Sequence, residues 1–425
     1  MRLTIVIPAY NEEAAIAQII TRCLKAEPMI CSSAAVDSVQ VIVVSDGSTD
    51  RTAKIARGYP QVRLIEFPEN RGYGAAIKRG FAEGRGELVA FLDADGTCDP
   101  RFFGLLCDAL VREGADIAVG SRMGSDSRMP RVRRLGNTVF ALLLGALSNR
   151  AVSDTASGMR VLRREALELL YPLPDGLNFT PAMSAQALLD DRISIIELPM
   201  KYEERVGRSK LSVVKDGLRF FGAIMEAVLV WRPSRLFVSG GLLFGLLALL
   251  LIMGPAEEYL RQRIVREGMI YRLLFCSLLM TLAATLLSVS LVAERLSRSL
   301  LGRRGAQSFV ESMLSKLLSW RGLMVVGSGL MLIAFVLVGP GLLEYAMTRH
   351  VTLHWSRIVL GGAAVFCAAQ MAIGAALAHM AQVCIRRQAH REAAGAKAQQ
   401  ECSPFKRQAE SGEKPEPVGD EHVLV

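Results

Sequence analysis

The segment LVAFLDAD, residues 88–95, is an apolar run that ends abruptly in two aspartates. Five consecutive apolar residues with polar neighbours are typical of a strand buried on both faces of a parallel sheet. At an extended strand end, residues i and i+2 point to the same side, so Asp93 and Asp95 are expected to converge. The segment therefore predicts an α/β fold with a ligand site beyond the carboxyl end of this strand.

Four more short apolar runs lie within the first 205 residues: Leu3–Ile7, Val39–Val44, Val62–Phe67 and Ile117–Val119. Segments with helical spacing separate them: Glu12–Leu24, Asp50–Tyr59, Gly74–Ala82 and Pro100–Arg112. Strands that alternate with helices form βαβ units, which build a mostly parallel sheet. We therefore expect an α/β domain over residues 1–208.

A polar motif follows each of the five predicted strands. In chain order the motifs read PAYNEE (residues 8–13), SDGSTD (45–50), NRGYG (70–74), DADG (93–96) and GSR (120–122). The carboxyl ends of parallel strands meet at one edge of a sheet, so these motifs are expected to share one rim.

The two aspartates of residues 93–95 are the sharpest of these features. Converging carboxylates repel each other unless a cation lies between them, and Mg²⁺ or Mn²⁺ accepts a few carboxylates together with water and phosphate oxygens. An isolated pair of this kind more often marks a solvated turn. The accompanying motifs favour a metal ion that holds a nucleotide diphosphate.

The second half of the chain is much more apolar than the first. Four stretches without a charged residue are each close to the roughly 20 residues that span a bilayer: Leu236–Met253, Leu273–Val292, Leu323–Leu343 and Ile358–Ala378. They predict four transmembrane helices within residues 233–385, and the polar residues 386–425 predict a disordered cytoplasmic tail. The 51% hydrophobic content of the whole chain is then an average over two unlike parts.

The charges of the loops predict the orientation of these spans. Loop 293–321 contains six basic residues and loop 344–357 contains two, which places the first domain and both termini in the cytoplasm, in a cell (inner) membrane protein. Loop 254–272 disagrees, since it would lie outside and yet contains four arginines. The eight cysteines show no C-x-x-C pair and are expected to be reduced.

Together the motifs resemble the glycosyltransferases of family 2, which have the nucleotide-sugar-binding fold called GT-A. The closest likeness is to the dolichol-phosphate mannose synthase and polyprenyl-phosphate glycosyltransferase group, and it covers roughly residues 1–230. Residues 8–13 look like the opening nucleotide motif of this group. SDTASGMR (153–160) resembles its D-x-x-S-G-x-R segment, and RVGRSKL (205–211) its closing R-x-G-x-S-K-L element.

The resemblance implies roles for individual residues. Asp93 and Asp95 would hold Mg²⁺ or Mn²⁺, with Asp95 directly involved in catalysis. A GDP- or UDP-linked sugar would be bound by Asp93 and by Pro8, Tyr10, Glu12 and Asp46. Lys78, after the Gly-Tyr-Gly turn, is expected to contact the nucleotide or its sugar. Members of this group often have a glutamine at the position of Thr97, so the third protein ligand of the metal stays open.

The acceptor is expected to be a phosphate. The stretch GLNFTPAMS (176–184) corresponds to the place where family members that glycosylate a hydroxyl carry a general base, and no carboxylate appears before Asp190. A hydroxyl acceptor needs such a base, whereas a phosphate monoester, with a second pKa of about 6, is already an anion at neutral pH. This reasoning favours a polyprenyl (undecaprenyl or dolichyl) phosphate.

Positive side chains must then offset the repulsion between the acceptor phosphate and the nucleotide diphosphate. Arg122, Arg133, Arg205 and Lys210 are predicted to bind the acceptor phosphate, and Arg122 and Arg205 to take part in catalysis. The neighbouring arginines 131, 134 and 208 are assigned to the membrane surface. Apolar residues at helical spacing predict an amphipathic interfacial helix over residues 209–232, with packing against the soluble domain as the alternative.

The sequence thus predicts a membrane-bound, metal-dependent, inverting glycosyltransferase that makes a sugar-phosphate lipid at the cytoplasmic face. A processive polysaccharide synthase is one alternative, but its Q-x-x-R-W marker is absent, since residues 262–266 read QRIVR. A non-catalytic scaffold or lipid translocase is the other, and intact Asp93 and Asp95 disfavour it. The net charge of +9 arises near the predicted acceptor site and the membrane, so no nucleic-acid partner is expected. A homo-oligomer is left open.

Overall fold

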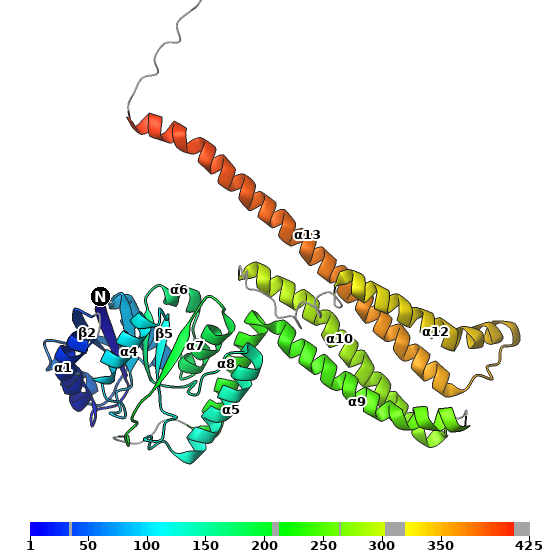
Figure 1. Ribbon diagram of the computed structural model, residues 1–425, viewed down its shortest axis with the longest axis horizontal. Helices are drawn as coiled ribbons and strands as arrows, with labels where there is room; N and C mark the ends of the chain where they lie inside the picture. The colour runs from blue at the N-terminus through cyan, green and yellow to red at the C-terminus, as the bar shows by residue number, and fades with distance from the viewer. Residues whose placement is uncertain (34–35, 206–211, 263–264, 302–318, 412–425) are drawn as a thin grey trace, which may run out of the picture. The chain divides into compact units, whose positions relative to one another are not determined.

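The computed structural model describes residues 1–33, 36–205, 212–262, 265–301 and 319–411. The chain divides into two compact units, Met1–Leu236 and Phe237–Val425. The first contains the sheet and its helices, and the second consists of long helices (Figure 1).

A seven-stranded sheet with the order β3-β2-β1-β4-β6-β5-β7 forms the centre of the first unit. Its strands are β1 (Arg2–Ala9), β2 (Ser38–Asp46), β3 (Arg63–Phe67), β4 (Leu88–Leu92), β5 (Ile117–Ser121), β6 (Met159–Arg163) and β7 (Ile195–Pro199). All neighbouring strands are parallel except that β6 runs antiparallel to β4 and β5. The predicted α/β class with a mostly parallel sheet is confirmed.

Strands β6 and β7 have no counterpart among the five predicted strands. Arg160 and Arg163 interrupt the apolar pattern of β6, which hides the strand from a hydrophobicity argument. Arg160 is nevertheless completely buried, because its guanidinium donates to the backbone oxygens of Ser157 at 3.1 Å and Thr155 at 2.9 Å. A buried arginine requires hydrogen-bond partners, and these come together only in the folded chain, so the sequence does not show that Arg160 can lie in a buried strand.

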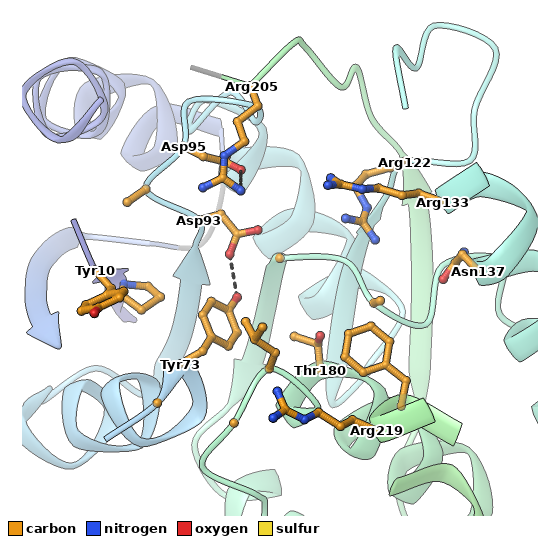
Figure 2. Close-up of a pocket in the computed structure, with 18 of the residues that line it drawn as sticks. Tyr10, Tyr73, Asp93, Asp95, Arg122, Arg133, Asn137, Thr180, Arg205 and Arg219 are labelled. Carbon is orange, nitrogen blue, oxygen red and sulfur yellow. Dashed lines mark hydrogen bonds and ion pairs between the residues drawn. The ribbon is translucent and has the colours of Figure 1, made fainter. Parts of the chain in front are cut away.

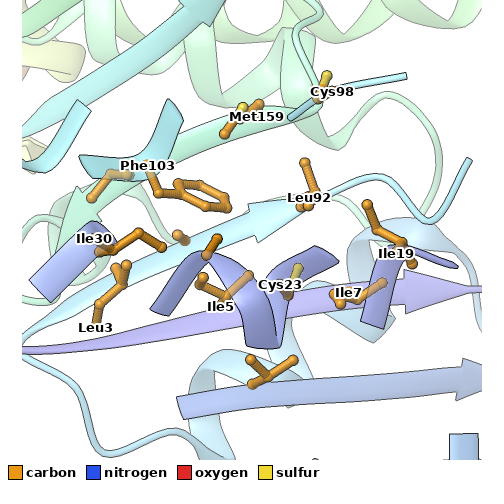
Figure 3. Close-up of a cluster of buried hydrophobic side chains, with 14 of the residues drawn as sticks. Leu3, Ile5, Ile7, Ile19, Cys23, Ile30, Leu92, Cys98, Phe103 and Met159 are labelled. Carbon is orange, nitrogen blue, oxygen red and sulfur yellow. The ribbon is translucent and has the colours of Figure 1, made fainter. Parts of the chain in front are cut away.

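Helices cover both faces of the sheet. On one face α1 (Ile16–Ser33) and α4 (Phe102–Arg112) pack on alternate residues of β1 such as Ile5 and Ile7 (Figure 3). On the other face α3 (Tyr73–Glu83) and α7 (Phe179–Leu189) pack around Val6, whose side chain points the opposite way. The short helices α2 (Thr52–Arg57) and α6 (Ala166–Leu170) complete these layers.

Two further helices, α5 (Arg131–Ser148) and α8 (Val213–Trp231), belong to the first unit. Helix α8 packs against α7 and α5 and buries Phe220, Ile224 and Val228. Its Leu218 stays 69% exposed, as does Leu142 of α5. Within the range 209–232 predicted to form an interfacial helix, the residues of α8 pack on the α/β domain, which agrees with the alternative, and still leave apolar side chains exposed. Residues 209–211 lie outside the described chain.

Among the described residues from Pro233 onward, four helical stretches are long and apolar enough to cross a membrane. They are Pro233–Gln262, Glu267–Leu300, Trp320–Thr348 and Trp355–Ile385, and each contains one of the predicted spans. They correspond to α9 (Pro233–Gln262), the short η1 (Glu267–Met269) with α10 (Ile270–Leu300), α12 (Trp320–Thr348) and α13 (Trp355–Ser411). Helix α13 packs against α10 and α12.

The structure differs from the sequence prediction in the tail. Helix α13 continues to Ser411, so residues 386–411 are helical where disorder was expected, and residues 412–425 lie outside the described chain. Ala, Gln, Glu, Lys and Arg are frequent in residues 386–411 and are good helix formers, which the reading based on polarity overlooked.

Candidate functional site

A cavity of about 620 Å³ lies at the carboxyl end of the sheet. The strand-end motifs line one part of it, and α5 and α8 line another (Figure 2). Nine of the eleven predicted site residues line this cavity: Pro8, Tyr10, Glu12, Asp46, Asp93, Asp95, Arg122, Arg133 and Arg205. The structure thus brings together residues that are up to 197 positions apart in the sequence, from Pro8 to Arg205.

Two predicted site residues are not among those that line the cavity. Lys78 binds the backbone oxygen of Leu173 at 2.8 Å and the carboxylate of Asp175 at 2.6 Å, so it holds a neighbouring loop. A nucleotide contact by Lys78 is not supported by this placement. Lys210 lies outside the described residues.

The two aspartates do not have the expected extended geometry. Strand β4 ends at Leu92, and Ala94 and Asp95 form a turn. The turn arises because Gly96 adopts a positive φ of 76° and the Asp95 carboxylate accepts a hydrogen bond from the Thr97 backbone N–H two residues on. Figure 2 shows the result: Asp93 points toward Tyr73, and Asp95 points toward Arg205.

Asp93 is enclosed by Tyr73 and Gly158. The Tyr73 hydroxyl donates to Asp93 Oδ1 at 2.6 Å, and a Cβ added at Gly158 would lie only 1.9 Å from Asp93 Oδ2. Burial and the charge of Asp95 raise the pKa of Asp93 to about 7, although Tyr73 and nearby arginines oppose this change. The surrounding arginines and the Tyr73 hydroxyl therefore do not fully offset the cost of keeping the Asp93 carboxylate ionised.

The hydroxyl of Thr97 contacts the carboxylate of Asp95. The Thr97 side chain is 1% exposed, and its hydroxyl donates to Asp95 Oδ1 at 2.7 Å. Since the hydroxyl proton is used in this way, Thr97 acts as a hydrogen-bond partner of a carboxylate. This contact does not assign the third protein ligand of the metal, which stays open.

Arg205 places a positive charge beside Glu12 and Asp95. Its guanidinium lies 2.8 Å from Glu12 and 3.6 Å from Asp95 Oδ2. Its Nε atom is buried and has no hydrogen-bond partner among the described residues. An unsatisfied buried donor is costly, so this arrangement is suited to an anion that completes the set of partners.

Arg122 forms a buried ion pair with Asp154. The two residues make a bidentate contact, with Nε to Oδ2 at 2.7 Å and Nη2 to Oδ1 at 2.8 Å. The Asp154 side chain is completely buried, and the Arg122 guanidinium also lies over the Tyr202 ring at 5.6 Å. Asp154 orients Arg122 in the cavity wall and offsets part of its charge.

Asp46 has a structural role in addition to any contact with a ligand. It is 3% exposed and accepts backbone hydrogen bonds from Arg71 at 2.7 Å and Gly72 at 2.9 Å. These bonds join the end of β2 to the start of α3. Asp46 therefore shapes the loop that carries Tyr73.

The part of the cavity between α5 and α8 is apolar. Helix α5 contributes Val132, Gly136 and Phe140, and helix α8 contributes Val213, Gly217 and Phe220. The rings of Phe140 and Phe220 lie 6.3 Å apart. Arg133 and Arg219 line the same cavity, so positive and apolar groups occur side by side.

Sequence reasoning did not identify Tyr73, Gly158, Asn137 or Thr180 as lining residues. Tyr73 was taken as part of a tight turn, and Gly158 as part of a family segment. Asn137 lies within a helix, where its donation to Ser153 O and its acceptance from Thr155 are invisible in the sequence. Only the position of Tyr73 within the strand-end motif of residues 70–74 could have indicated its role.

The donor set at the strand ends suits a divalent cation. Within the described chain no three or more His, Cys, Asp or Glu side chains are grouped to hold a metal by themselves, so solvent or a ligand would have to supply the other positions. Asp93 and Asp95 both line the cavity, and Arg205 supplies a positive charge next to Asp95 and Glu12. Two carboxylates completed by water and phosphate oxygens match the coordination that Mg²⁺ accepts.

Comparison with known proteins gives consistent similarities. Residues 4–170 match the family described as Glycosyl transferase family 2. The low-salt glycan biosynthesis hexosyltransferase Agl6 of Haloferax volcanii is 35% identical over 266 residues, which are 60% of each chain. The dolichyl-phosphate hexose transferase of the same organism is 32% identical over 234 residues, which cover 54% of this chain and 95% of that protein.

Among solved structures, glucosyl-3-phosphoglycerate synthase from Mycobacterium tuberculosis, in complex with Mn²⁺, UDP and glucosyl-3-phosphoglycerate, is similar with a TM-score of 0.41. It is 24% identical, and the match covers 53% of this chain and 78% of that one.

Proposed function

Because this chain belongs to glycosyl transferase family 2, we propose that it transfers one sugar from a nucleotide-sugar donor to a polyprenyl phosphate. The observation that carries the proposal is a single cavity in which carboxylates, arginines and apolar side chains of α5 and α8 occur together. The carboxylate end suits a nucleotide diphosphate with its metal ion. The apolar end suits a lipid phosphate.

The donor is assigned to the strand-end side of the cavity. Pro8 lies near the end of β1, Tyr10 and Glu12 follow it, Asp46 ends β2, and all four line the cavity. Asp93 and Asp95 would hold Mg²⁺ or Mn²⁺. A bound divalent cation neutralises charge that develops on the departing diphosphate.

The acceptor is assigned to the arginine-rich side. Arg122 and Arg133 line the cavity, and Arg205 lines it beside Glu12 and Asp95. The buried Nε of Arg205, which has no partner among the described residues, offers a donor to a phosphate oxygen. The described α5 and α8 residues that line the cavity include no Asp or Glu. Asp190, the first carboxylate after the acceptor stretch, is buried and bound to Arg192 at 2.8 Å.

This charge distribution supports an acceptor that needs no general base. A phosphate monoester is anionic at neutral pH and can attack the sugar carbon directly, while the arginines offset its repulsion from the diphosphate. Direct displacement inverts the anomeric carbon. We place the reaction at the cytoplasmic face of a cell membrane, because loop 293–321 contains more basic residues than loop 344–357.

The apolar surface of α5 and α8 supports a position at the membrane. Leu135, Val139 and Leu142 of α5 and Val214, Leu218 and Phe221 of α8 are all exposed. Helix α9, long and apolar enough to span a bilayer, begins at Pro233, two residues after α8 ends. Exposed apolar residues next to such a segment are suited to the lipid interface, where a polyprenyl phosphate has its head group.

The full chain in lipid nanodiscs tests the proposal. GDP- and UDP-linked sugars carrying a radiolabel are supplied with undecaprenyl phosphate, dolichyl phosphate or the corresponding alcohols, and the lipid product is extracted into chloroform. We expect product with a phosphate acceptor and not with an alcohol, and none with Asp95→Asn. Asp108→Asn is the matched control, because the half-exposed Asp108 pairs with Arg112 at 3.4 Å on α4 and does not line the cavity.

The proposal fails if no donor gives a lipid product, or if the alcohols serve as well as the phosphates. NMR of the product tests inversion through the anomeric configuration relative to the donor. Protease protection of residues 1–232 in inside-out vesicles tests the orientation.

A further inference from the structure

We infer that two hydroxyl groups, those of Tyr73 and Thr97, orient the carboxylates of Asp93 and Asp95 for the bound cation. This inference rests on the proposed metal-dependent function and adds two positioning residues to it. Neither hydroxyl is assigned to the metal itself. Each acts through the aspartate that it contacts.

The hydrogen bonds have the same form at both aspartates. Tyr73 Oη donates to Asp93 Oδ1 at 2.6 Å, and Thr97 Oγ1 donates to Asp95 Oδ1 at 2.7 Å. Among the described residues neither Oδ2 atom accepts a hydrogen bond, and Arg205 Nη1 lies 3.6 Å from Asp95 Oδ2. One oxygen of each carboxylate is therefore occupied, and the other remains for a cation.

Both hydroxyls lie on rigid parts of the fold. Tyr73 begins α3, whose first turn is in close contact with the loop before α7: a Cβ at Gly74 would lie 2.2 Å from the Pro174 oxygen. Gly72 reaches this position with a φ of 106°, which favours glycine. Thr97 is almost completely buried, and hydrogen bonds strengthen in such surroundings.

The arrangement has a consequence for cation binding. The terminal torsion of an aspartate is broad and roughly two-fold, so a carboxylate without a partner can present either oxygen. The two hydroxyls remove that freedom before the cation arrives. Hydrogen-bond partners of metal-ligating carboxylates typically change metal affinity or activity by about 10- to 100-fold when they are removed.

The test uses the full chain in nanodiscs and the variants Tyr73→Phe and Thr97→Val, which remove only the hydroxyl function. Mn²⁺ binding is followed by electron paramagnetic resonance in the presence of GDP and, separately, UDP. Nucleotide affinity without metal and the melting temperature are measured on the same samples. Each variant is expected to bind Mn²⁺ about 10- to 100-fold more weakly, with the other two quantities unchanged.

Two further variants serve as controls. Thr97→Ser keeps a hydroxyl and is expected to restore Mn²⁺ affinity. Tyr59→Phe also removes a phenol hydroxyl, but that hydroxyl contacts Thr21 and Ala17 O of α1 at 3.3 Å and is expected to have no effect on Mn²⁺.

The inference is overturned if Tyr73→Phe and Thr97→Val bind Mn²⁺ as tightly as the wild type. It is also overturned if the variants lose stability and metal-free nucleotide affinity in parallel, because the hydroxyls would then serve the fold alone. If the wild-type chain binds no Mn²⁺ with either nucleotide, the metal-dependent function itself is wrong and the inference falls with it. These results are distinguishable in one set of samples.

Discussion

The guanidinium of Arg205 lies 2.8 Å from the carboxylate of Glu12, although the two residues are 193 positions apart. The same guanidinium lies 3.6 Å from Asp95 Oδ2. A single arginine therefore balances two carboxylates at the place where we propose that a divalent cation binds. This relationship connects the stability of the empty site with cation binding.

Arg205→Ala is expected to destabilise the metal-free protein. Loss of one partner of a buried ion pair costs about 3–5 kcal/mol, but Arg205 is 24% exposed, so we expect about 1–2 kcal/mol. For a unit of this size that lowers the melting temperature by about 2–8 °C. Scanning fluorimetry with and without Mn²⁺ and GDP or UDP should show that the deficit shrinks when the cation is present.

The matched control for Arg205→Ala is Arg128→Ala, since the Arg128–Glu204 pair has side chains that are 70% and 80% exposed. Its melting temperature should stay close to the wild-type value. If Mn²⁺ does not reduce the loss of melting temperature caused by Arg205→Ala, the bound cation does not replace the positive charge of Arg205, and the proposal is contradicted.

Gly158→Ala is expected to lower kcat by about 100-fold without unfolding the protein, because a displacement of about 1 Å at a reacting centre can have that effect. The new Cβ would lie 1.9 Å from Asp93 Oδ2 and must push the carboxylate aside. Steady-state kinetics and circular dichroism measure the two effects. Gly145→Ala on α5, where the nearest atom is 3.8 Å away, should be neutral. Full activity of Gly158→Ala contradicts the placement of Asp93.

The Arg122–Asp154 pair predicts a pH dependence of stability. Burial alone raises the pKa of Asp154, but the charge and hydrogen bonds of Arg122 outweigh burial and lower it below its usual range. A carboxyl group with a lowered pKa stabilises the fold above its unfolded pKa, about 3.9, and this contribution is lost as the pH falls through the folded pKa.

At pH 7, Asp154→Asn should lower the melting temperature by about 6–12 °C, since it leaves a buried guanidinium without its counter-charge at a cost of about 3 kcal/mol. The difference from the wild type should narrow as the pH falls below about 4. Asp108→Asn, at a half-exposed position on α4, should show no such change. If the difference in melting temperature between Asp154→Asn and the wild type stays constant down to pH 3, the Arg122–Asp154 pair is not the cause of the pH dependence of stability.

The exposed apolar surface of α5 and α8 predicts a dependence on the length of the acceptor lipid. Leu142→Glu and Leu218→Glu should each raise the KM for a long polyprenyl phosphate in nanodiscs by roughly tenfold, since burial of a leucine contributes about 1.5–3 kcal/mol. The kcat with a short, water-soluble prenyl phosphate should not change. Leu105→Glu on α4, which covers the opposite face of the sheet, should alter neither value. Equal effects on both acceptors would point to misfolding instead of a lost lipid contact.

Local sequence patterns were sufficient to predict most strands and most candidate site residues of the first unit. Each of the five predicted strands coincides with an observed strand, because apolar runs between polar motifs report burial directly. Nine of eleven predicted site residues line one cavity, since the carboxyl ends of parallel strands must meet at one edge. The contacts of Lys78 with Leu173 and Asp175 could not be read from the sequence, because these partners come from a segment about 95 positions away, and its contact with the nucleotide stays a prediction.

The sequence by itself determined the α/β class, the four apolar helices and the identity of the strand-end residues, because these depend on composition and on spacing within short segments. The tertiary structure alone decided which partner each charged group has. The hydrogen bond between Tyr73 and Asp93 and the contacts of Arg205 arise from packing between distant segments. The energy of a buried charge depends on the groups that surround it in space, and neighbours in the sequence do not specify those groups.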